Sequence, residues 1–287
     1  MNYKENYWDS PVLKAEFISF LERIHGVDLT VWNDMGFWDN DYRPCCYFAG
    51  ESMVSNVCLY SMDMIVNGKP LRAGQISAVG THLDFRRRGL SYDLTQKALR
   101  QASDSYDFYF LYADTDARRL YEKCGFRSVE QFKCAIDAPS VNSQRGAVRL
   151  NTNEKDHVAL IWRLVSEREP VSLTLGCLNS KLFMFWILCY LHDCIYHIPE
   201  LDVLIVTKMD GGVVTVYDII GSRIPPFADI YPYIKSESDR SVEFLFMTDR
   251  MQLESERLVK VADSGAYVMG DFELEGRKFL FPFTSQA

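Results

Sequence analysis

The feature that most constrains the fold is a strand that runs into a basic, glycine-containing turn and then directly into a helix, within residues 74–102. Residues 74–82 are strand-like, and residues 90–102 carry apolar side chains on one helical face. The turn between them reads RRRG at residues 86–89. A strand, a tight turn and a helix in this order predict an α/β chain in which helices cover a sheet.

The rest of the sequence alternates strand-like and helix-like segments, and its two halves repeat one order of elements. Each half predicts a hairpin, a helix, a strand, a second helix and closing strands. Asn67-Gly68 and Gly211-Gly212 are expected to form the hairpin turns, because such dipeptides adopt the backbone of tight turns. We expect helices at residues 11–25, 90–102, 117–124, 154–166, 178–191, 227–234 and 252–261, and strands at residues 45–48, 54–64, 74–82, 108–113, 126–136, 201–207, 213–219, 242–247, 267–274 and 278–283.

The length of 287 residues predicts two domains, each large enough to bury a core. A polar stretch without periodicity, residues 137–153, marks the boundary between an expected domain 1–140 and an expected domain 150–287. The longest apolar run, residues 182–191, is about half of what a membrane-spanning helix needs. The first residues are polar and do not resemble a secretory signal, so we expect a cytoplasmic protein without a membrane partner.

The charge balance excludes a general nucleic-acid binder. The chain has 31 Lys plus Arg against 39 Asp plus Glu, a net charge of −8, whereas nucleic-acid-binding domains carry a basic face. The eight cysteines lie mostly in apolar segments and are expected to be free thiols. Cys189, His192, Cys194 and His197 lie close together, but their spacing is not that of paired zinc knuckles, and we expect no metal.

The basic turn has the chemistry of an anion site. The first N–H groups of a helix have no partner within the helix, and the dipole places positive charge there. Gly89 lets a phosphate approach the backbone, and Ser91 is small enough not to obstruct it. The arginines add local positive charge to an acidic chain. These residues together predict a cradle for a pyrophosphate.

Two motifs carry a resemblance to a known family. Arg86-x-x-Gly89-x-Ser91 resembles the Q/R-x-x-G-x-G/A signature of the GNAT superfamily of N-acyltransferases, with Ser91 in place of the usual Gly or Ala. LYEKCGF at residues 120–126 is similar to the segment that ends the cofactor region of that superfamily. The resemblance is close over residues 32–133 and rests on element order alone in the C-terminal half. It implies the GNAT fold, a mixed central sheet with flanking helices, in two tandem GNAT-like halves of the kind found in bacterial proteins of unassigned substrate.

The resemblance also implies an acetyl-coenzyme A site in the first half. Tyr121 matches a tyrosine that often protonates the leaving thiolate, although a core aromatic is the plain alternative. Asp114 stands where relatives often carry Asn. The second half is expected to lack a cofactor site, because residues 221–226, GSRIPP, keep one arginine and two prolines without N–H groups. The residues expected to bind the cofactor are Val79, Gly80, Thr81, Arg86, Arg87, Arg88, Gly89, Leu90, Ser91, Asp114, Ala117 and Tyr121.

The general base and the acceptor site are less well defined. His82 is the candidate base, with water-mediated proton removal or a neutral acceptor as open alternatives. The loop at residues 32–42 interleaves aromatic side chains with carboxylates, which would suit a cationic amine, although a loop held by its aromatics is an equal alternative. Trp38, Asp41 and Tyr42 are its candidate acceptor-binding residues.

The resemblance implies an N-acetyltransferase that moves an acetyl group from acetyl-coenzyme A to a primary amine of a small molecule or peptide by direct attack. A non-catalytic acyl-coenzyme A sensor and an aminoglycoside-type acetyltransferase remain alternatives. Homodimer formation is left open, and the catalytic residues expected are Tyr121 and His82.

Overall fold

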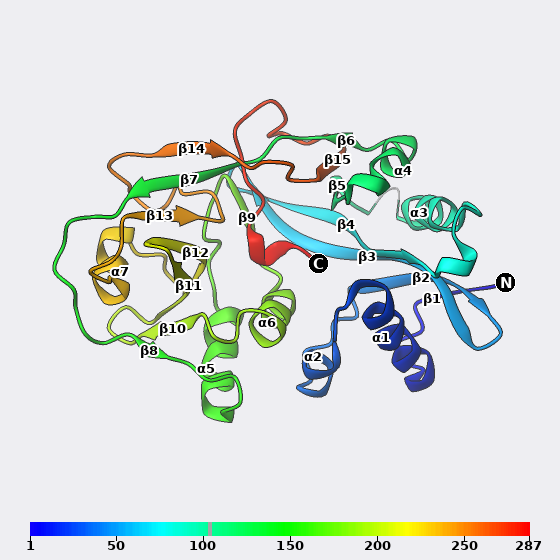
Figure 1. The fold of residues 1–287 in the computed structure, drawn as a ribbon, viewed down its shortest axis with the longest axis horizontal. Coiled ribbons are helices and arrows are strands. Elements are labelled where there is room, and N and C mark those ends of the chain that lie inside the picture. The colour runs from blue at the N-terminus through cyan, green and yellow to red at the C-terminus, as the bar shows by residue number, and fades with distance from the viewer. Residues whose placement is uncertain (103–104) are drawn as a thin grey trace.

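The computed structural model describes residues 1–102 and 105–287, which form two mixed β-sheets with helices packed against them (Figure 1). The helices are α1 Pro11–His25, α2 Thr30–Asp34, α3 Leu90–Gln101, α4 Arg118–Lys123, α5 Lys155–Ser166, α6 Ser180–Cys189 and α7 Phe227–Ile234, with 3-10 turns η1 Leu83–Phe85, η2 Thr115–Ala117 and η3 Phe283–Ser285. The mixed α/β class expected from the sequence is confirmed.

The first sheet has the order β1-β2-β3-β4-β5-β15-β6, with β9 paired to β3, and the second has the order β14-β7-β13-β12-β11-β10-β8. The strands of the first sheet are β1 Asn2–Glu5, β2 Tyr42–Ala49, β3 Ser52–Val66, β4 Lys69–Thr81, β5 Phe108–Tyr112, β6 Arg127–Ser128, β9 Leu175–Cys177 and β15 Ala266–Gly270. Those of the second are β7 Phe132–Asp137, β8 Val148–Arg149, β10 Ile195–Ile198, β11 Val203–Asp210, β12 Val213–Ile220, β13 Ser241–Phe244 and β14 Arg257–Lys260.

Both expected hairpins are confirmed. Asn67 and Gly68 join β3 to β4, with φ of 49° and 76°, as a two-residue turn with positive φ at both positions requires. Gly211 and Gly212 join β11 to β12 in the same way, with φ of 57° and 84°. The first hairpin carries the longest ladder of the molecule and forms the wall on which the candidate site is built.

The two sheets exchange strands. In the first sheet, β4 and β5 are parallel and β15, from the end of the chain, follows β5 in antiparallel pairing. In the second sheet, β12 and β13 are parallel and β7, from the first half, follows β13 in the same way. Figure 1 shows β7 beside β13 and β14, and β15 beside β5 and β6. The first sheet thus takes β9 and β15 from beyond the polar stretch near residues 140–150, and the second sheet takes β7 from before it.

Three element predictions near the strand exchange are wrong. Residues 252–261, expected as a helix, contain β14, because the edge of β7 offers backbone hydrogen bonds that override a weak helix preference. The single strand expected at residues 126–136 is split into β6 and β7, because the chain crosses between sheets there. The strand expected at residues 278–283 is irregular and leads into η3.

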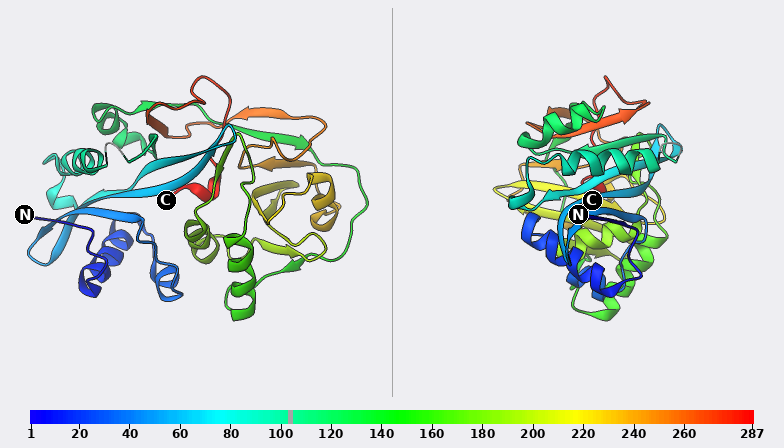
Figure 2. Two further views of the ribbon diagram at one scale, coloured as in Figure 1. Left: turned by 180° about the vertical axis from the view of Figure 1, so that it is seen from behind. Right: turned by 90° about the vertical axis from the view of Figure 1, so that its right-hand side faces the viewer.

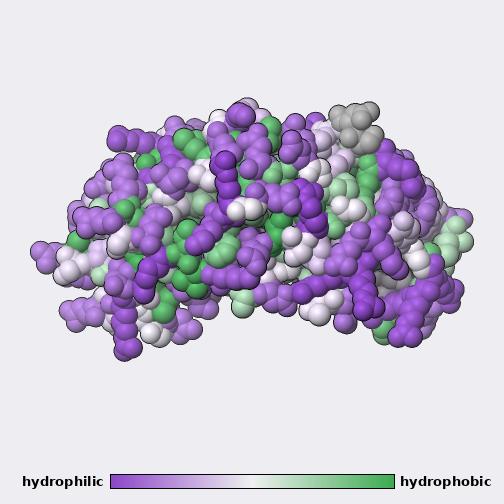
Figure 3. Space-filling view, turned by 90° about the horizontal axis from the view of Figure 1, so that it is seen from above, coloured by the Kyte–Doolittle hydropathy of each residue, from purple (hydrophilic) through white to green (hydrophobic). Residues whose placement is uncertain are grey.

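Helices cover both faces of the first sheet. On one face, Leu94 and Ala98 of α3 pack with Val57 and Ile76 of the sheet. On the other face lie α1 and α2, with α2 beside α6 of the second half, and η3 near the C-terminus packs against α6 (Figure 2). From above, hydrophobic side chains are scattered among hydrophilic ones (Figure 3). Among the described residues, no helix has the length and apolar character needed to cross a bilayer.

Candidate active site

A β-bulge shapes the strand that leads to the basic turn. Asn56 of β3 pairs with Gly80, whereas Cys58 pairs with Ser77, so β4 has one residue more than β3 in this interval. The extra residue distorts β4, and Ala78 adopts a φ of +48°, which a non-glycine residue rarely does. Strained backbone of this kind persists only where the surroundings hold it.

The side chain of Asn56 holds the bulge. Its Nδ2 donates to the carbonyl oxygen of Ala78 at 2.8 Å, and its Oδ1 accepts from Sγ of Cys46 at 3.0 Å. Asn56 is fully buried. Because a buried amide with filled hydrogen bonds has little freedom to turn, the bulge is fixed before any ligand arrives.

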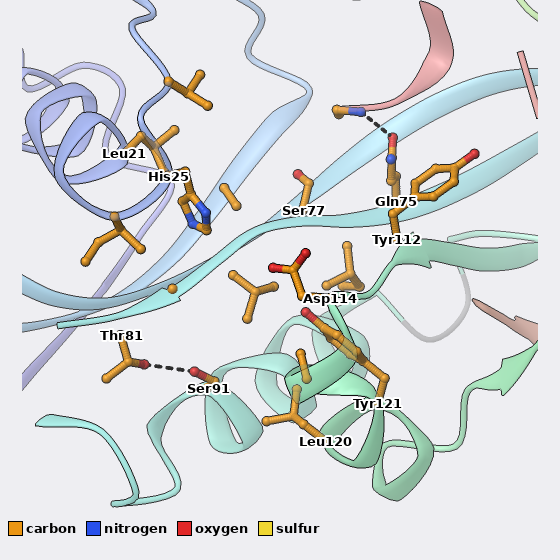
Figure 4. A pocket seen from close by; sticks show the side chains of 18 of the residues that line it. Leu21, His25, Gln75, Ser77, Thr81, Ser91, Tyr112, Asp114, Leu120 and Tyr121 are labelled. Atoms are coloured by element: carbon orange, nitrogen blue, oxygen red, sulfur yellow. Dashed lines mark hydrogen bonds between the residues drawn. The ribbon is translucent and has the colours of Figure 1, made fainter. Parts of the chain in front are cut away.

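The strands β4 and β5 separate at the bulge. Their parallel pairing covers only residues 73–75 of β4 and 108–110 of β5, although β4 continues to Thr81. A cavity of about 1070 Å³ lies where they part, and it extends from the basic turn to α6 and Ala287. Figure 4 shows side chains from α1, β4, β5 and α4 facing this cavity.

The cradle end of the cavity is the N-terminus of α3. Gly89 caps the helix with a φ of +76°, and a Cβ placed there would meet no atom within 4 Å, so open space lies over the first turn. Arg86 donates through Nε to the carbonyl oxygen of Thr81 at 3.0 Å, and the hydroxyls of Thr81 and Ser91 are 2.8 Å apart. These bonds hold the turn in shape, and the helix N-terminus beside open space suits an anion.

The middle of the cavity holds Tyr121, Asp114 and His25 (Figure 4). Burial raises the pKa of Tyr121, and the negative charge of Asp114 raises it further, so the phenol stays protonated at neutral pH. Burial lowers the pKa of His25, while Asp114 opposes that shift. A neutral imidazole and a protonated phenol thus face one cavity, which provides one proton acceptor and one proton donor.

Gly80 allows α1 to approach the bulge. A Cβ on Gly80 would lie 2.8 Å from Cγ2 of Ile24 and 3.0 Å from Nε2 of His25, closer than real contacts allow. His25 is the last residue of α1, so this close approach places its ring over the bulged strand.

The structure brings most of the sequence-predicted residues to the cavity. Arg86 and Arg87 line its cradle end, and Tyr42 lines the opposite end. The predicted residues that line the cavity are Val79, Gly80, Thr81, Arg86, Arg87, Gly89, Leu90, Ser91, Asp114, Ala117, Tyr121 and Tyr42.

Four predicted residues lie outside the cavity lining: His82, Arg88, Trp38 and Asp41. His82 instead caps η1, with Nδ1 accepting from the backbone N–H of Asp84 at 3.4 Å. Arg88 donates to the carbonyl oxygen of Asp84 at 2.8 Å and lies over the Phe85 ring. Trp38 is buried in the aromatic core beneath α1, and Asp41 is exposed, its backbone N–H bonded to Oδ1 of Asp39.

Sequence reasoning missed the residues that reach the cavity through tertiary contacts. His25 carries no motif, and Trp32 and Tyr60 look like ordinary core residues. Leu182 and Phe185 come from α6 in the second half, and the backbone N–H of Ala287 donates to Oε1 of Gln75 at 3.0 Å. The sequence around these residues carries no motif that marks them as part of a site.

No metal cluster is found in the part of the chain that the structure describes. Among residues 1–102 and 105–287, no group of three or more His, Cys, Asp or Glu side chains is arranged to hold an ion. Cys189 ends α6, Cys194 is buried just before β10, and His197 lies within β10, bonded to Asp202 at 3.4 Å.

A strand bulge, a helix N-terminus beneath a basic turn and a buried tyrosine surround one cavity. Residues 36–129 match the family model described as "Acetyltransferase (GNAT) domain". The match places a GNAT acetyltransferase domain within residues 36–129 of this chain. A comparison with curated protein sequences found no match.

Solved structures share the architecture over nearly the whole chain. Eis1 from Mycobacterium abscessus has a TM-score of 0.60 at 12% identity, with 94% of this chain and 73% of that chain covered. A probable N-acyltransferase from Enterococcus faecalis has a TM-score of 0.58 at 11% identity, with 93% of this chain and 72% of that chain covered. A GCN5-related N-acetyltransferase from Kribbella flavida has a TM-score of 0.54 at 13% identity, with 93% of this chain and 70% of that chain covered. At these identities the likeness shows the fold alone.

Proposed function

We propose that the protein is an N-acetyltransferase that moves an acetyl group from acetyl-coenzyme A to a primary amine by direct attack. The observation that carries this proposal is the single cavity that joins the α3 N-terminus to Tyr121 and then to a second end walled by both halves of the chain. The cradle suits a pyrophosphate, the middle suits acyl transfer, and the far end leaves room for the acceptor. Small-molecule and peptide amines are both compatible with this proposal.

The cradle residues would bind the pyrophosphate through charge and backbone donors. Arg86 and Arg87 line the cavity beside the free N–H groups of the first turn of α3, and Gly89 leaves the approach open. The bulge leaves Ala78 and Val79 outside the ladder with β3, and their N–H groups would be the donors offered to the acyl group. Backbone donors fixed in advance stabilise an oxyanion without reorganisation.

In the proposed reaction, the amine nitrogen attacks the thioester carbonyl carbon, a C–N bond forms and the C–S bond breaks. His25 accepts the proton that the amine loses, and Tyr121 gives its hydroxyl proton to the leaving sulfur. Both side chains line the cavity in the protonation state that these roles require. The amine loses one proton and the leaving thiolate gains one, so the transfer of the acetyl group is balanced.

Acceptor-dependent release of free thiol tests this function. Purified protein is mixed with acetyl-coenzyme A and a panel of primary amines, and thiol is followed by absorbance with a colorimetric reagent. Release above the hydrolysis background with at least one amine, together with a mass gain of one acetyl group on that amine, supports transfer. Tight coenzyme A binding without release from any amine would instead favour a non-catalytic sensor.

Substitution of Gly89 should weaken coenzyme A binding. In Gly89→Val, the new side chain points into the open space over the α3 N-terminus, so we expect the dissociation constant to rise at least about 10-fold in calorimetry. Gly276→Val is the matched control, because Gly276 has a φ of +78° and also no neighbour within 4 Å of a Cβ. An equal loss of coenzyme A affinity in both variants would show that backbone strain causes the loss. It would contradict the assignment of the α3 N-terminus as the pyrophosphate cradle.

We expect one coenzyme A per chain. The counterpart of the cradle in the second half precedes α7, where Pro226 is the cap and the N–H of Phe227 already donates to the carbonyl oxygen of Met251 at 3.0 Å. The first turn of α7 therefore has fewer free donors than that of α3. Titration calorimetry should give a stoichiometry near one, and a value near two would refute the assignment of the second half as a degenerate copy.

A further inference from the structure

The lysine and arginine side chains that line the cavity come from two separate elements. Arg86 and Arg87 belong to the cradle turn that precedes α3. Among the described residues, the other Lys and Arg of the lining are Arg119 and Lys123, which belong to α4. We call these two residues the α4 pair. The positive charge of the cavity is therefore divided between the cradle and a second helix.

Helix α4 is fixed beside α3. Tyr121 of α4 and Leu94 of α3 belong to one buried cluster, and the two helices lie side by side (Figure 1, Figure 4). Arg118, at the start of α4, forms an ion pair with Asp263. A spacing of four residues places both members of the α4 pair on one face of the helix, and both line the cavity. The pair therefore has a defined place next to the cradle.

The α4 pair has no partner within the part of the chain that the structure describes. There, neither Arg119 nor Lys123 forms an ion pair or a side-chain hydrogen bond. Arg127, just beyond α4, is by contrast held by Glu275 through hydrogen bonds of 2.7 and 2.5 Å. Both members of the pair are exposed. Two unpaired cations on one helical face, in a chain with a net charge of −8, are available to an anionic ligand.

The side-chain carboxylates of the lining do not neutralise the α4 pair. Asp114 and Asp116 follow β5 and line the cavity. Asp114 lies beside Tyr121, whose pKa its charge raises. Asp116 is exposed and, within the described chain, forms no ion pair with Arg119 or Lys123. The positive charge of the pair is therefore free to act on a bound molecule.

Coenzyme A has two separate phosphate groups, the pyrophosphate and a phosphate on the 3′ oxygen of its ribose. A phosphomonoester carries about −1.5 to −2 charge at neutral pH and three strong acceptor oxygens. The α3 N-terminus with Arg86 and Arg87 forms one anion site, which the proposed function assigns to the pyrophosphate. The second phosphate needs its own counter-charge, and the α4 pair is the unpaired basic group of the lining beside the cradle.

We propose that Arg119 and Lys123 form a second phosphate site that binds the 3′-phosphate of coenzyme A, a proposal that rests on the proposed function. The Arg119 guanidinium donates two parallel hydrogen bonds to phosphate oxygens, and the Lys123 ammonium adds a point charge. The site makes the protein discriminate coenzyme A from acyl donors that lack this phosphate, such as acyl groups carried on a bare phosphopantetheine arm.

Dephospho-coenzyme A, which lacks only the 3′-phosphate, isolates the contribution of the proposed site. Calorimetry on the full chain measures the Kd of coenzyme A and of dephospho-coenzyme A in the same low-salt buffer. We expect the Kd of dephospho-coenzyme A to be at least about 10-fold higher, because charge-assisted contacts to a phosphate are strong even when they stay partly exposed. Equal dissociation constants would overturn the proposal.

Replacing both members of the α4 pair should abolish the discrimination. Their side chains are exposed, so the double variant Arg119→Gln, Lys123→Gln is expected to fold. We expect its Kd for coenzyme A to rise at least about 10-fold, while its Kd for dephospho-coenzyme A changes less than about twofold. An equal loss of affinity for both ligands would show that the pair does not contact the 3′-phosphate, and would overturn the proposal.

Arg100→Gln is the matched control for the loss of one positive charge. Arg100 is exposed near the end of α3 and does not line the cavity. Its variant should keep the discrimination between the two ligands, whereas Arg119→Gln alone should reduce it more than about threefold. An equal reduction in both variants would attribute the discrimination to the overall field of the protein and would overturn the site.

These binding measurements are independent of acetyl transfer. If the discrimination is found and is lost in the double variant, while no amine releases thiol, the transfer function fails and the second phosphate site stands. If thiol is released while both ligands bind equally, the transfer function stands and the second phosphate site is overturned. An absence of any coenzyme A binding would overturn both.

Discussion

Tyr121→Phe should lower kcat by about 10² to 10⁴, the range that a positioned general acid contributes, with little change in coenzyme A affinity. The phenol lines the cavity, and burial raises its pKa, so it keeps the proton that the leaving thiolate needs. Phenylalanine retains the ring that packs against Phe126, 6.2 Å between centroids, and removes only the hydroxyl. Steady-state rates with saturating acetyl-coenzyme A measure the loss in kcat, and calorimetry measures the affinity.

Tyr267→Phe is the matched control for the loss of a buried tyrosine hydroxyl. Tyr267 belongs to the same core cluster as Tyr121 but does not line the cavity. Its variant should keep kcat within about twofold of the unmodified protein. A kcat for Tyr121→Phe that also stayed within twofold would reduce Tyr121 to a packing role.

His25→Gln should lower kcat/KM by about 10² at pH 8 and have a smaller effect at lower pH. Burial lowers the pKa of His25, and the carboxylate of Asp114 is the charge that opposes the shift. The imidazole is neutral and able to accept a proton above its pKa, and it is protonated and inactive below it. The advantage of the unmodified protein should therefore disappear as the pH falls through a pKa below 6.5.

The measurement is the ratio of kcat/KM between the unmodified protein and the variant, taken from pH 5 to pH 9. The ratio cancels the titration of the acceptor amine, which is common to both enzymes. A ratio that does not vary with pH would exclude His25 as the base. If His82→Gln reproduced the pH dependence instead, the sequence-based candidate would be correct, although His82 caps η1 away from the cavity.

The strand-turn-helix cradle could be predicted from the sequence because its parts are contiguous. The turn at residues 86–89, the cap at Gly89 and the helix that follows are governed by local backbone chemistry. The Asn67-Gly68 turn is predictable for the same reason, since two positive φ values close the hairpin without help from distant residues. Tyr121 followed from its motif, which is also local.

The candidate base could not be found in this way. His82 stands beside the cradle in sequence and lies outside the cavity, whereas His25 is 55 positions before Gly80 and reaches it because Gly80 has no side chain to hold α1 away. Nothing in the residues around His25 distinguishes it from any other helix-terminal histidine. Its position depends on how closely α1 packs on the sheet, which is a tertiary quantity.

The sequence by itself determined the class of fold, the hairpins and the strand-turn-helix at residues 74–101, because each depends on interactions within a few residues of chain. The tertiary structure decided the exchange of β7 and β15, the strand at residues 257–260, and the part of the cavity wall that comes from α6. Leu182 and Phe185 meet Trp32 and Tyr60 only after both halves have packed together. Strand pairing and such contacts join residues more than 100 positions apart, and they are selected by the burial and hydrogen bonding of the whole molecule, which no local pattern contains.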